Sequence, residues 1–250
     1  MQTSTATVAA SGVARHPGMR RPARSRFYVG LTALMIAVVV VGFWPTYFGP
    51  MLRGNVARAA VVQLHGLVFV GWMALLMAQV VLAARGRIDL HKRIGRYGIW
   101  YGGLVVVMGL IVGPASGVMH VHAGEWTRDR AAGFLLTTFG DMVLFGGFFA
   151  AAVAYRARPE IHKRLIVAAT VALLFAAIGR MTFITSGSLG AAVWLSPMLV
   201  GLAYDWISSR RVHAVYVVST IVLFVGATRI LFEQSEAWLR IGRPIIDALL

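Results

Sequence analysis

The chain has 250 residues, a net charge of +15, no cysteine and 58% hydrophobic residues, with a mean hydropathy of +0.74. A water-soluble globular protein is excluded, because the charged residues fall in short clusters between long apolar runs. The missing cysteines exclude disulfides and thiolate metal sites, and basic clusters at the ends of apolar runs indicate lipid headgroups rather than nucleic acid as the partner.

Residues 1–26 are small, polar and basic, which predicts a disordered cytoplasmic tail. The apolar run that follows, Phe27 to Phe48, is longer than the hydrophobic region of a signal peptide. It also lacks a small-x-small cleavage site. We therefore expect it to be retained as the first transmembrane helix.

Seven segments approach the roughly 20 apolar residues that cross a bilayer as a helix. This predicts an all-α membrane protein whose transmembrane domain covers residues 27–232. Residues 233–250 mix isoleucines and leucines with charges, and we expect a short interfacial segment interrupted by Pro244. The predicted spans are Phe27–Phe48, Ala60–Ala84, Tyr97–Gly113, Ala131–Tyr155, Leu165–Ile184, Leu189–Ile207 and Val212–Phe232.

The basic residues are distributed unequally between the two sides of this topology. Sixteen lysines and arginines fall on the side of the N-terminus and six on the other. The positive-inside rule then predicts a cytoplasmic N-terminus and a periplasmic or extracellular C-terminus. Arginine outnumbers lysine 22 to 2, which is typical of a GC-rich bacterial genome and favours a bacterial inner membrane.

A ten-residue pattern, R-x-R-x-[DE]-[LI]-H-K-R-[IL], occurs twice. Both copies, Arg85–Ile94 and Arg156–Leu165, fall in predicted cytoplasmic turns, and a weaker echo, Arg210–His213, falls in the third such turn. This predicts a solitary first helix followed by three repeated helix hairpins. The acidic and basic residues suit a helix start and the topology, but these roles do not explain the recurring histidine.

The histidines suggest ligands at two depths. His91 and His162 open the third and fifth predicted helices, His65 lies about one turn below the outer surface, and His120 follows the third helix. Neutral imidazole is a strong ligand for haem iron, so the pairs His91 with His162 and His65 with His120 could carry electrons across the bilayer. In this arrangement the chain resembles the di-haem transmembrane cytochromes b, and that resemblance implies haem b.

Two further sets of residues suggest binding sites. His120 and His122, with His65 or Asp129, could bind a transition metal such as copper or zinc. Asp141, Arg180 and Arg229 fall at similar depth inside the hydrocarbon, where a charge must pair or face water. We expect an Asp141–Arg180 bridge, with Arg229 left to snorkel outward or to hold an anion.

The sequence contains no phosphate-binding glycine loop, nucleophile elbow or H-E-x-x-H motif. Three classes of function remain open, and the sequence does not show whether the chain is an enzyme. The first is a haem- or metal-binding redox protein, and the second is a small-solute or proton-coupled transporter that uses the Asp/Arg site. The third is an accessory or assembly subunit that joins partner subunits of a membrane complex.

Overall fold

The structure is a computed structural model that describes residues 21–54 and 59–250, and within these residues it contains helices but no strand. Seven helical spans are long and apolar enough to cross a membrane, which confirms the predicted all-α fold class. The elements are α1 (Arg21–Phe43), η1 (Trp44–Phe48), α2 (Gly49–Leu52), α3 (Ala60–Ala84), α4 (Ile88–His122), α5 (Arg128–Ala154), α6 (Pro159–Ile178), α7 (Gly187–Ser209), α8 (Ala214–Ala227), η2 (Thr228–Phe232) and α9 (Glu236–Asp247).

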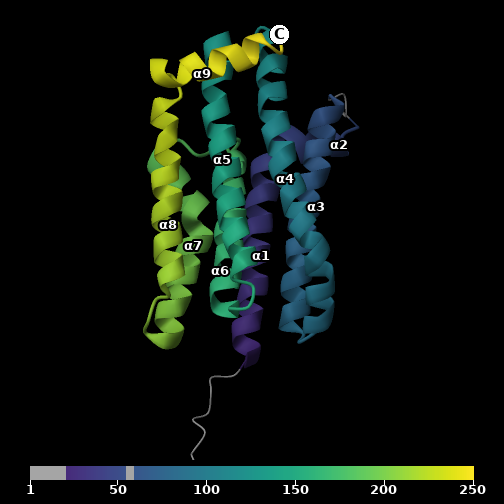
Figure 1. Cartoon of the computed structure of the whole chain (residues 1–250), viewed down its shortest axis with the longest axis vertical. Coiled ribbons are helices and arrows are strands. Elements are labelled where there is room, and N and C mark those ends of the chain that lie inside the picture. The colour runs from purple at the N-terminus through teal and green to yellow at the C-terminus, as the bar shows by residue number, and fades with distance from the viewer. Residues whose placement is uncertain (1–20, 55–58) are drawn as a thin grey trace, which may run out of the picture.

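The spans form one bundle of roughly parallel helices (Figure 1). The first residues of α1 lie at one end of this bundle, and α9 lies across the other end. The turns α3–α4, α5–α6 and α7–α8 are at the end where α1 begins. These are the turns that carry the two copies of the repeated pattern and its echo.

Helix α6 is the centre of the bundle. It packs against α1, α5, α7 and α8, and 61% of its most apolar stretch is buried, against 17% to 33% for the other spans. Its interior face is built from small residues such as Ala168, Ala169 and Ala172. Small side chains let neighbouring backbones approach closely, which is how helices gain packing energy in lipid. The α3–α4 hairpin, in contrast, lies at an edge of the bundle (Figure 1).

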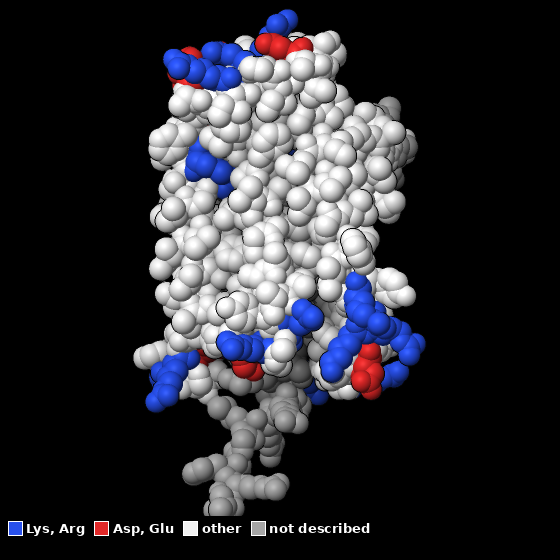
Figure 2. All heavy atoms as spheres, in the orientation of Figure 1, with Lys and Arg blue, Asp and Glu red and all other residues white. Residues whose placement is uncertain are grey.

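On the face shown in Figure 2, charged side chains gather at the two ends of the bundle, and the surface between them is uncharged except for one basic patch. Large apolar side chains on this belt, such as Leu67, Val143 and Ile207, are well exposed. In water such a surface would be unfavourable, but lipid chains solvate it. The distribution therefore fits a bundle that spans a bilayer.

The first and last segments differ from their predictions. Helix α1 begins at Arg21, so the end of the predicted disordered tail is helical, while residues 1–20 lie outside the described residues. At the other end, Pro244 does not interrupt α9, which continues to Asp247. Contacts with α5 hold the helix in place, because Leu239 and Ile246 are buried against α5 and Arg243 pairs with Asp129 of the same helix.

Helix α4 is much longer than its predicted span, Tyr97 to Gly113. Pro114 removes one backbone hydrogen bond, yet it is buried within the continuous helix. Gly113 and Gly117 on either side let α5 approach closely, because a β-carbon at either position would meet Thr138 or Ala131. Packing against a neighbour thus compensates for the proline, as it does in many transmembrane helices.

Helix α6 ends earlier than predicted, at Ile178 rather than Ile184. Arg180 consequently lies in the link between α6 and α7 instead of inside a helix. The cap of α7 sets the other limit of this link, because the Ser186 hydroxyl accepts a hydrogen bond from the Leu189 N–H.

Candidate functional site

The two histidines of the repeated pattern lie next to each other. The ring centres of His91 and His162 are 6.5 Å apart, and the ring planes are nearly perpendicular, at 88°. Each is the fourth residue of its helix, α4 or α6, and donates its backbone N–H to the carbonyl of Arg87 or Arg158. Equal positions at two helix starts therefore bring the two imidazoles together.

Each of these imidazoles is also oriented by the helix that precedes it. The Nδ1 atom of His162 lies 2.8 Å from the carbonyl oxygen of Ala152, near the end of α5. The Nδ1 atom of His91 lies 3.2 Å from the carbonyl oxygen of Gln79, in the last turns of α3. A carbonyl can only accept, so its contact with His162 places the proton on Nδ1 and leaves the lone pair on Nε2. The Nδ1 of His91 also lies 2.6 Å from the side-chain amide nitrogen of Gln79, so the Gln79 carbonyl alone does not fix the tautomer of His91.

The arginines of the two copies have very different surroundings. Arg164 is buried, with 3% of its side chain exposed, and forms a bidentate ion pair with Asp205 of α7, in which Nη2 donates to Oδ1 at 2.7 Å and Nε donates to Oδ2 at 3.2 Å. Its Nη1 also donates to Glu160 at 2.8 Å, and its guanidinium lies 5.2 Å from the ring centre of Tyr216. These contacts join α6 to α7 and α8 at the end of the bundle where the turns lie.

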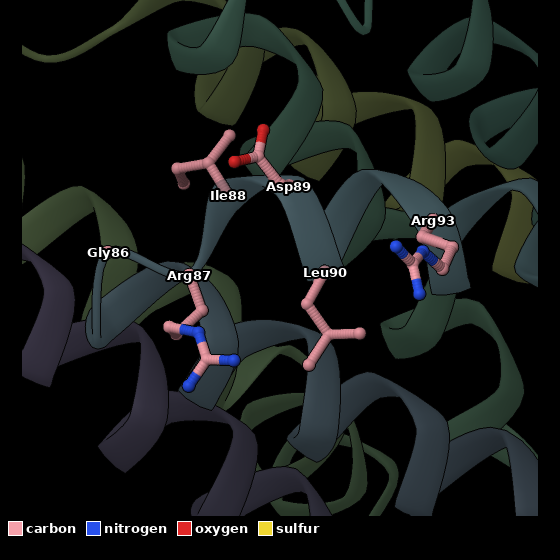
Figure 3. Close-up of a pocket in the computed structure, with 6 residues that line it drawn as sticks. All are labelled: Gly86, Arg87, Ile88, Asp89, Leu90 and Arg93. Atoms are coloured by element: carbon pink, nitrogen blue, oxygen red, sulfur yellow. The ribbon is translucent and has the colours of Figure 1, made fainter.

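The corresponding residues of the first copy are at the surface. Asp89 and Arg93 are exposed, and neither forms an ion pair with any other residue that the structure describes. They line a pocket of about 310 Å³ with Arg87, in which Asp89 points away from both arginines (Figure 3). The first copy thus lacks the interior partner that Asp205 provides for the second.

The Arg164–Asp205 pair was not predicted, because Arg164 was counted among the cations of a cytoplasmic turn. Asp205 gave a usable signal, since it is an acid within a predicted apolar span and such residues are expected to be paired. It also accepts from the backbone N–H of His213 at 3.2 Å, and so fixes the turn before α8.

His213 in the third turn does not occupy the position of the other two histidines. It caps α8, because its Nδ1 accepts a hydrogen bond from the Val215 N–H at 3.2 Å. Burial lowers the pKa of His213, and the positive charge of Arg164 lowers it further. The cap requires an unprotonated Nδ1, so both effects favour it.

The histidines expected at the other end have separate neighbours. His120 and His122 belong to the last turn of α4 rather than to a loop. The ring of His120 stacks on Trp126 at 4.2 Å, and its Nδ1 is bonded to Glu125. The ring of His65 packs against Phe69 at 4.1 Å. Between residues 21 and 250, leaving aside 55–58, no three histidine, aspartate or glutamate side chains gather closely enough to hold a metal ion.

The charges inside the bundle pair differently from the expectation. Asp141 of α5 forms its ion pair with Arg229 of η2, not with Arg180. The early end of α6 places Arg180 elsewhere, where its guanidinium lies 4.7 Å from the ring centre of Phe43. Space for Arg229 comes from Gly140, because a β-carbon there would overlap the arginine side chain.

Other polar groups surround the Asp141–Arg229 pair. Arg229 donates through Nη1 to the Gly226 carbonyl at 2.6 Å and lies over the Phe175 ring at 5.2 Å. Its Nε is buried and has no hydrogen-bond partner in the described part of the chain. Thr137, which precedes Asp141 in α5, donates a hydrogen bond from its hydroxyl to Glu233. This cluster connects α5 to η2 in the half of the bundle nearer α9.

Comparisons of this chain with protein-family models, with curated proteins and with solved structures give no match.

Proposed function

We propose that this chain is a multi-pass membrane protein that binds haem between the α3–α4 and α5–α6 turns, with His91 and His162 as the two axial ligands. The observation that carries the proposal is the 6.5 Å separation of the two ring centres. Two imidazoles that ligate one iron from opposite faces, each about 2 Å from the metal, have ring centres about 6 Å apart.

The surroundings of the two rings support a role as ligands. A metal-ligating histidine almost always donates its other ring N–H to a carbonyl or carboxylate, which fixes the tautomer and the ring orientation. The Ala152 carbonyl stands in this relation to the Nδ1 of His162, at 2.8 Å. His91 and His162 would hold and orient the group, and among the described residues no third histidine, aspartate or glutamate joins them to form a metal-binding cluster.

This two-ligand set suits haem better than a bare transition-metal ion. Zinc and copper sites take three or four protein ligands, whereas a porphyrin provides four nitrogens and leaves only two axial positions. An apolar groove of about 550 Å³ between α4 and α5 reaches Val153, the residue after Ala152, and offers the apolar surface that a tetrapyrrole needs. When bound, haem would supply one-electron transfer.

We further propose that the end of the bundle with the turns faces the cytoplasm of a bacterial inner membrane. Support comes from the sixteen cations assigned to this side against six on the other. The haem group would then lie near the cytoplasmic surface.

Haem absorbance after production with haem supplied tests the proposal. We expect a reduced-minus-oxidised b-type spectrum in the purified wild-type protein and its loss in His91→Ala and in His162→Ala. His122→Ala is the matched control, because this exposed histidine at the opposite end of α4 should leave the spectrum unchanged. A colourless wild-type protein, or equal spectra in all variants, would overturn the assignment.

The Asp141–Arg229 cluster favours a second candidate, transport of a small solute or of protons. An ion pair in the apolar part of a bundle is a functional candidate by default, and Glu233 adds a second carboxylate near it. Uptake by proteoliposomes that is lost in Asp141→Asn, from a colourless protein, would select this candidate. Absence of both haem and transport would leave an accessory or assembly subunit.

A further inference from the structure

Cations without an acidic partner gather where α4 begins. Five basic side chains lie in the α3–α4 turn and the first turns of α4, and all are exposed: Arg85, Arg87, Lys92, Arg93 and Arg96. None of them forms an ion pair with an acid in the described part of the chain. Figure 2 shows a basic group at this end of the bundle, at the lower right. Like charges repel one another, so this cluster is expected to attract an anion.

Two of these arginines line the pocket of about 310 Å³ at the start of α4. Leu90 lies between Arg87 and Arg93, and Asp89 points away from both (Figure 3). A guanidinium group matches a phosphate because its N–H donors can bond two oxygens in parallel. The pocket presents such donors from two sides with no acid between them, which suits a phosphate group.

An exposed face of α4 continues from this pocket toward the other end of the bundle. Tyr97 and Trp100 follow Arg93 after four and seven residues, and they are 73% and 81% exposed. Leu104 and Val107 continue the series and are also exposed. Steps of three and four residues keep side chains on one face of a helix. Cation, aromatic rings and aliphatic side chains therefore follow one another along a single face.

This order matches the chemical groups of one phospholipid. At 1.5 Å per residue, Trp100 lies about 10 Å and Leu104 about 16 Å along the helix from Arg93, within the roughly 20 Å of one leaflet. A phosphate at Arg93 would place the ester linkages near the Tyr97 hydroxyl and the Trp100 indole N–H, which are both donors. The acyl chains would then lie against Leu104 and Val107.

The other two turns lack this combination. In the second copy the matching arginine, Arg164, is buried, and so is Ala168 one turn later. The third turn exposes Arg210 and Arg211, but Tyr216, the next tyrosine along the chain, is buried. Diffuse attraction of anionic lipid is expected at every basic turn. Of the three turns, the α3–α4 turn alone adds an exposed aromatic and aliphatic face to its cations.

We propose that the Arg87–Arg93 pocket and the exposed face of α4 bind one anionic phospholipid, with its phosphate between the two arginines and its acyl chains along the helix. His91 lies two residues before Arg93, about 200° around the helix, where it contacts α3 and His162. The lipid site therefore does not depend on haem binding.

Quenching by brominated lipids measures which lipid lies beside Trp100. The protein is reconstituted into mixed phosphatidylcholine and phosphatidylglycerol bilayers in which one lipid or the other carries bromine on its acyl chains. Subtraction of the Trp100→Phe variant isolates the Trp100 signal. Trp206, which is 54% exposed and precedes Arg210 and Arg211, is the reference and is isolated in the same way.

Salt separates a bound lipid from diffuse attraction. At 1 M salt the Debye length is about 3 Å, so enrichment by long-range attraction should disappear. We expect phosphatidylglycerol to remain enriched beside Trp100 by roughly 5- to 10-fold over its share of the bilayer, and to show no enrichment beside Trp206.

Paired variants locate the phosphate. Arg87→Gln and Arg93→Gln should each lower the relative affinity for phosphatidylglycerol at Trp100 by roughly fivefold, the factor expected for one cation at a membrane surface. Arg93→Lys keeps the charge and should lose less than Arg93→Gln. The double variant Arg210→Gln with Arg211→Gln removes the same charge at the same end of the bundle and should leave the Trp100 signal unchanged.

Three outcomes would overturn the proposal. These are equal enrichment beside Trp100 and Trp206 at 1 M salt, an unchanged Trp100 signal when Arg87 and Arg93 are both replaced by glutamine, and displacement of the lipid by free inorganic phosphate. Haem content measured on the same samples should not change in these variants, which keeps this test separate from that of the proposed function.

Discussion

The two copies of the repeated turn pattern have nearly the same sequence but opposite environments. In the α5–α6 turn, Arg164 is buried in an ion pair with Asp205 and in contact with Tyr216. The corresponding residue of the first copy, Arg93 near the start of α4, is exposed. The histidines are the exception, because His91 and His162 meet each other.

The difference shows which parts of the pattern depend on location. An arginine at a helix start becomes a structural residue only where a neighbouring helix supplies an acid, as α7 does and α5 does not. The histidine keeps its position and its carbonyl contact in both copies. This is the behaviour expected of a pair that serves one shared purpose.

Breaking the buried ion pair should have the largest effect. Arg164→Leu leaves the Asp205 carboxylate buried without its cation, and we expect a loss of about 3 to 5 kcal/mol in unfolding free energy. Arg93→Leu, at the matched position of the exposed copy, should change stability by no more than about 0.5 kcal/mol. Unfolding of the detergent-solubilised protein by SDS titration measures both.

The double variant Arg164→Leu with Asp205→Leu is the control for this prediction. Removing both charges leaves no unpaired ion, so the double variant should be closer to wild type than Arg164→Leu alone. Equal losses from Arg164→Leu and Arg93→Leu would contradict the contrast between the two copies.

Glycine-to-alanine substitutions near the two copies should change the stability of the protein in opposite directions. A β-carbon at Gly201 would overlap the buried Tyr216 ring, so Gly201→Ala should cost about 1 to 3 kcal/mol. Gly95, just after the first copy, has open space around it, and Gly95→Ala should stabilise α4 by about 0.5 to 1 kcal/mol. Thermal unfolding midpoints of the two variants distinguish the signs, and a shift in the same direction would refute this prediction.

The third turn adds a pH-dependent effect. Because the folded protein lowers the pKa of His213, the folded state binds a proton less readily than the unfolded state. The stabilisation from the cap should be complete above pH about 6.5 and should decline at lower pH, by about 1 kcal/mol or less. The variant His213→Ser provides the comparison, because a serine hydroxyl caps α8 at any pH. The difference in unfolding free energy between wild type and this variant should become smaller as the pH is raised from 5 to 7.

Substitution of the acidic residue in each copy should give the smallest difference in unfolding free energy. Glu160 pairs with both Lys163 and Arg164, but 48% of its side chain is exposed and solvent screens the interaction. We expect Glu160→Gln to cost about 0.5 kcal/mol and Asp89→Asn to cost less than that. Urea or SDS titrations of the two variants compare them, and a larger loss from Asp89→Asn would reverse the assignment.

Much of the fold could be predicted from the sequence because each helix that crosses the hydrocarbon requires a run of about 20 apolar residues, and such runs are easy to recognise. All seven predicted spans correspond to helical spans. The errors arose where a local signal was outweighed by packing. The third predicted span ended at Gly113, but close contact with α5 carries α4 past Pro114 to His122.

The candidate site could be predicted only in part, because depth along a helix does not give direction around it. Sequence position placed His91 and His162 at one depth, and the structure brings them together. The same reasoning placed Asp141, Arg180 and Arg229 at one depth but could not tell which arginine faces the acid. The choice depends on the end of α6 and on the space beside Gly140, and both are properties of the packed bundle.

The most direct test of the haem assignment is near-infrared magnetic circular dichroism of the oxidised, haem-loaded protein, since its charge-transfer band identifies the axial ligands. We predict the signal of low-spin iron with two imidazole ligands, converted to a high-spin signal in His91→Ala and in His162→Ala. A low-spin signal that persists when both histidines are replaced together would contradict the claim that these two side chains hold the iron.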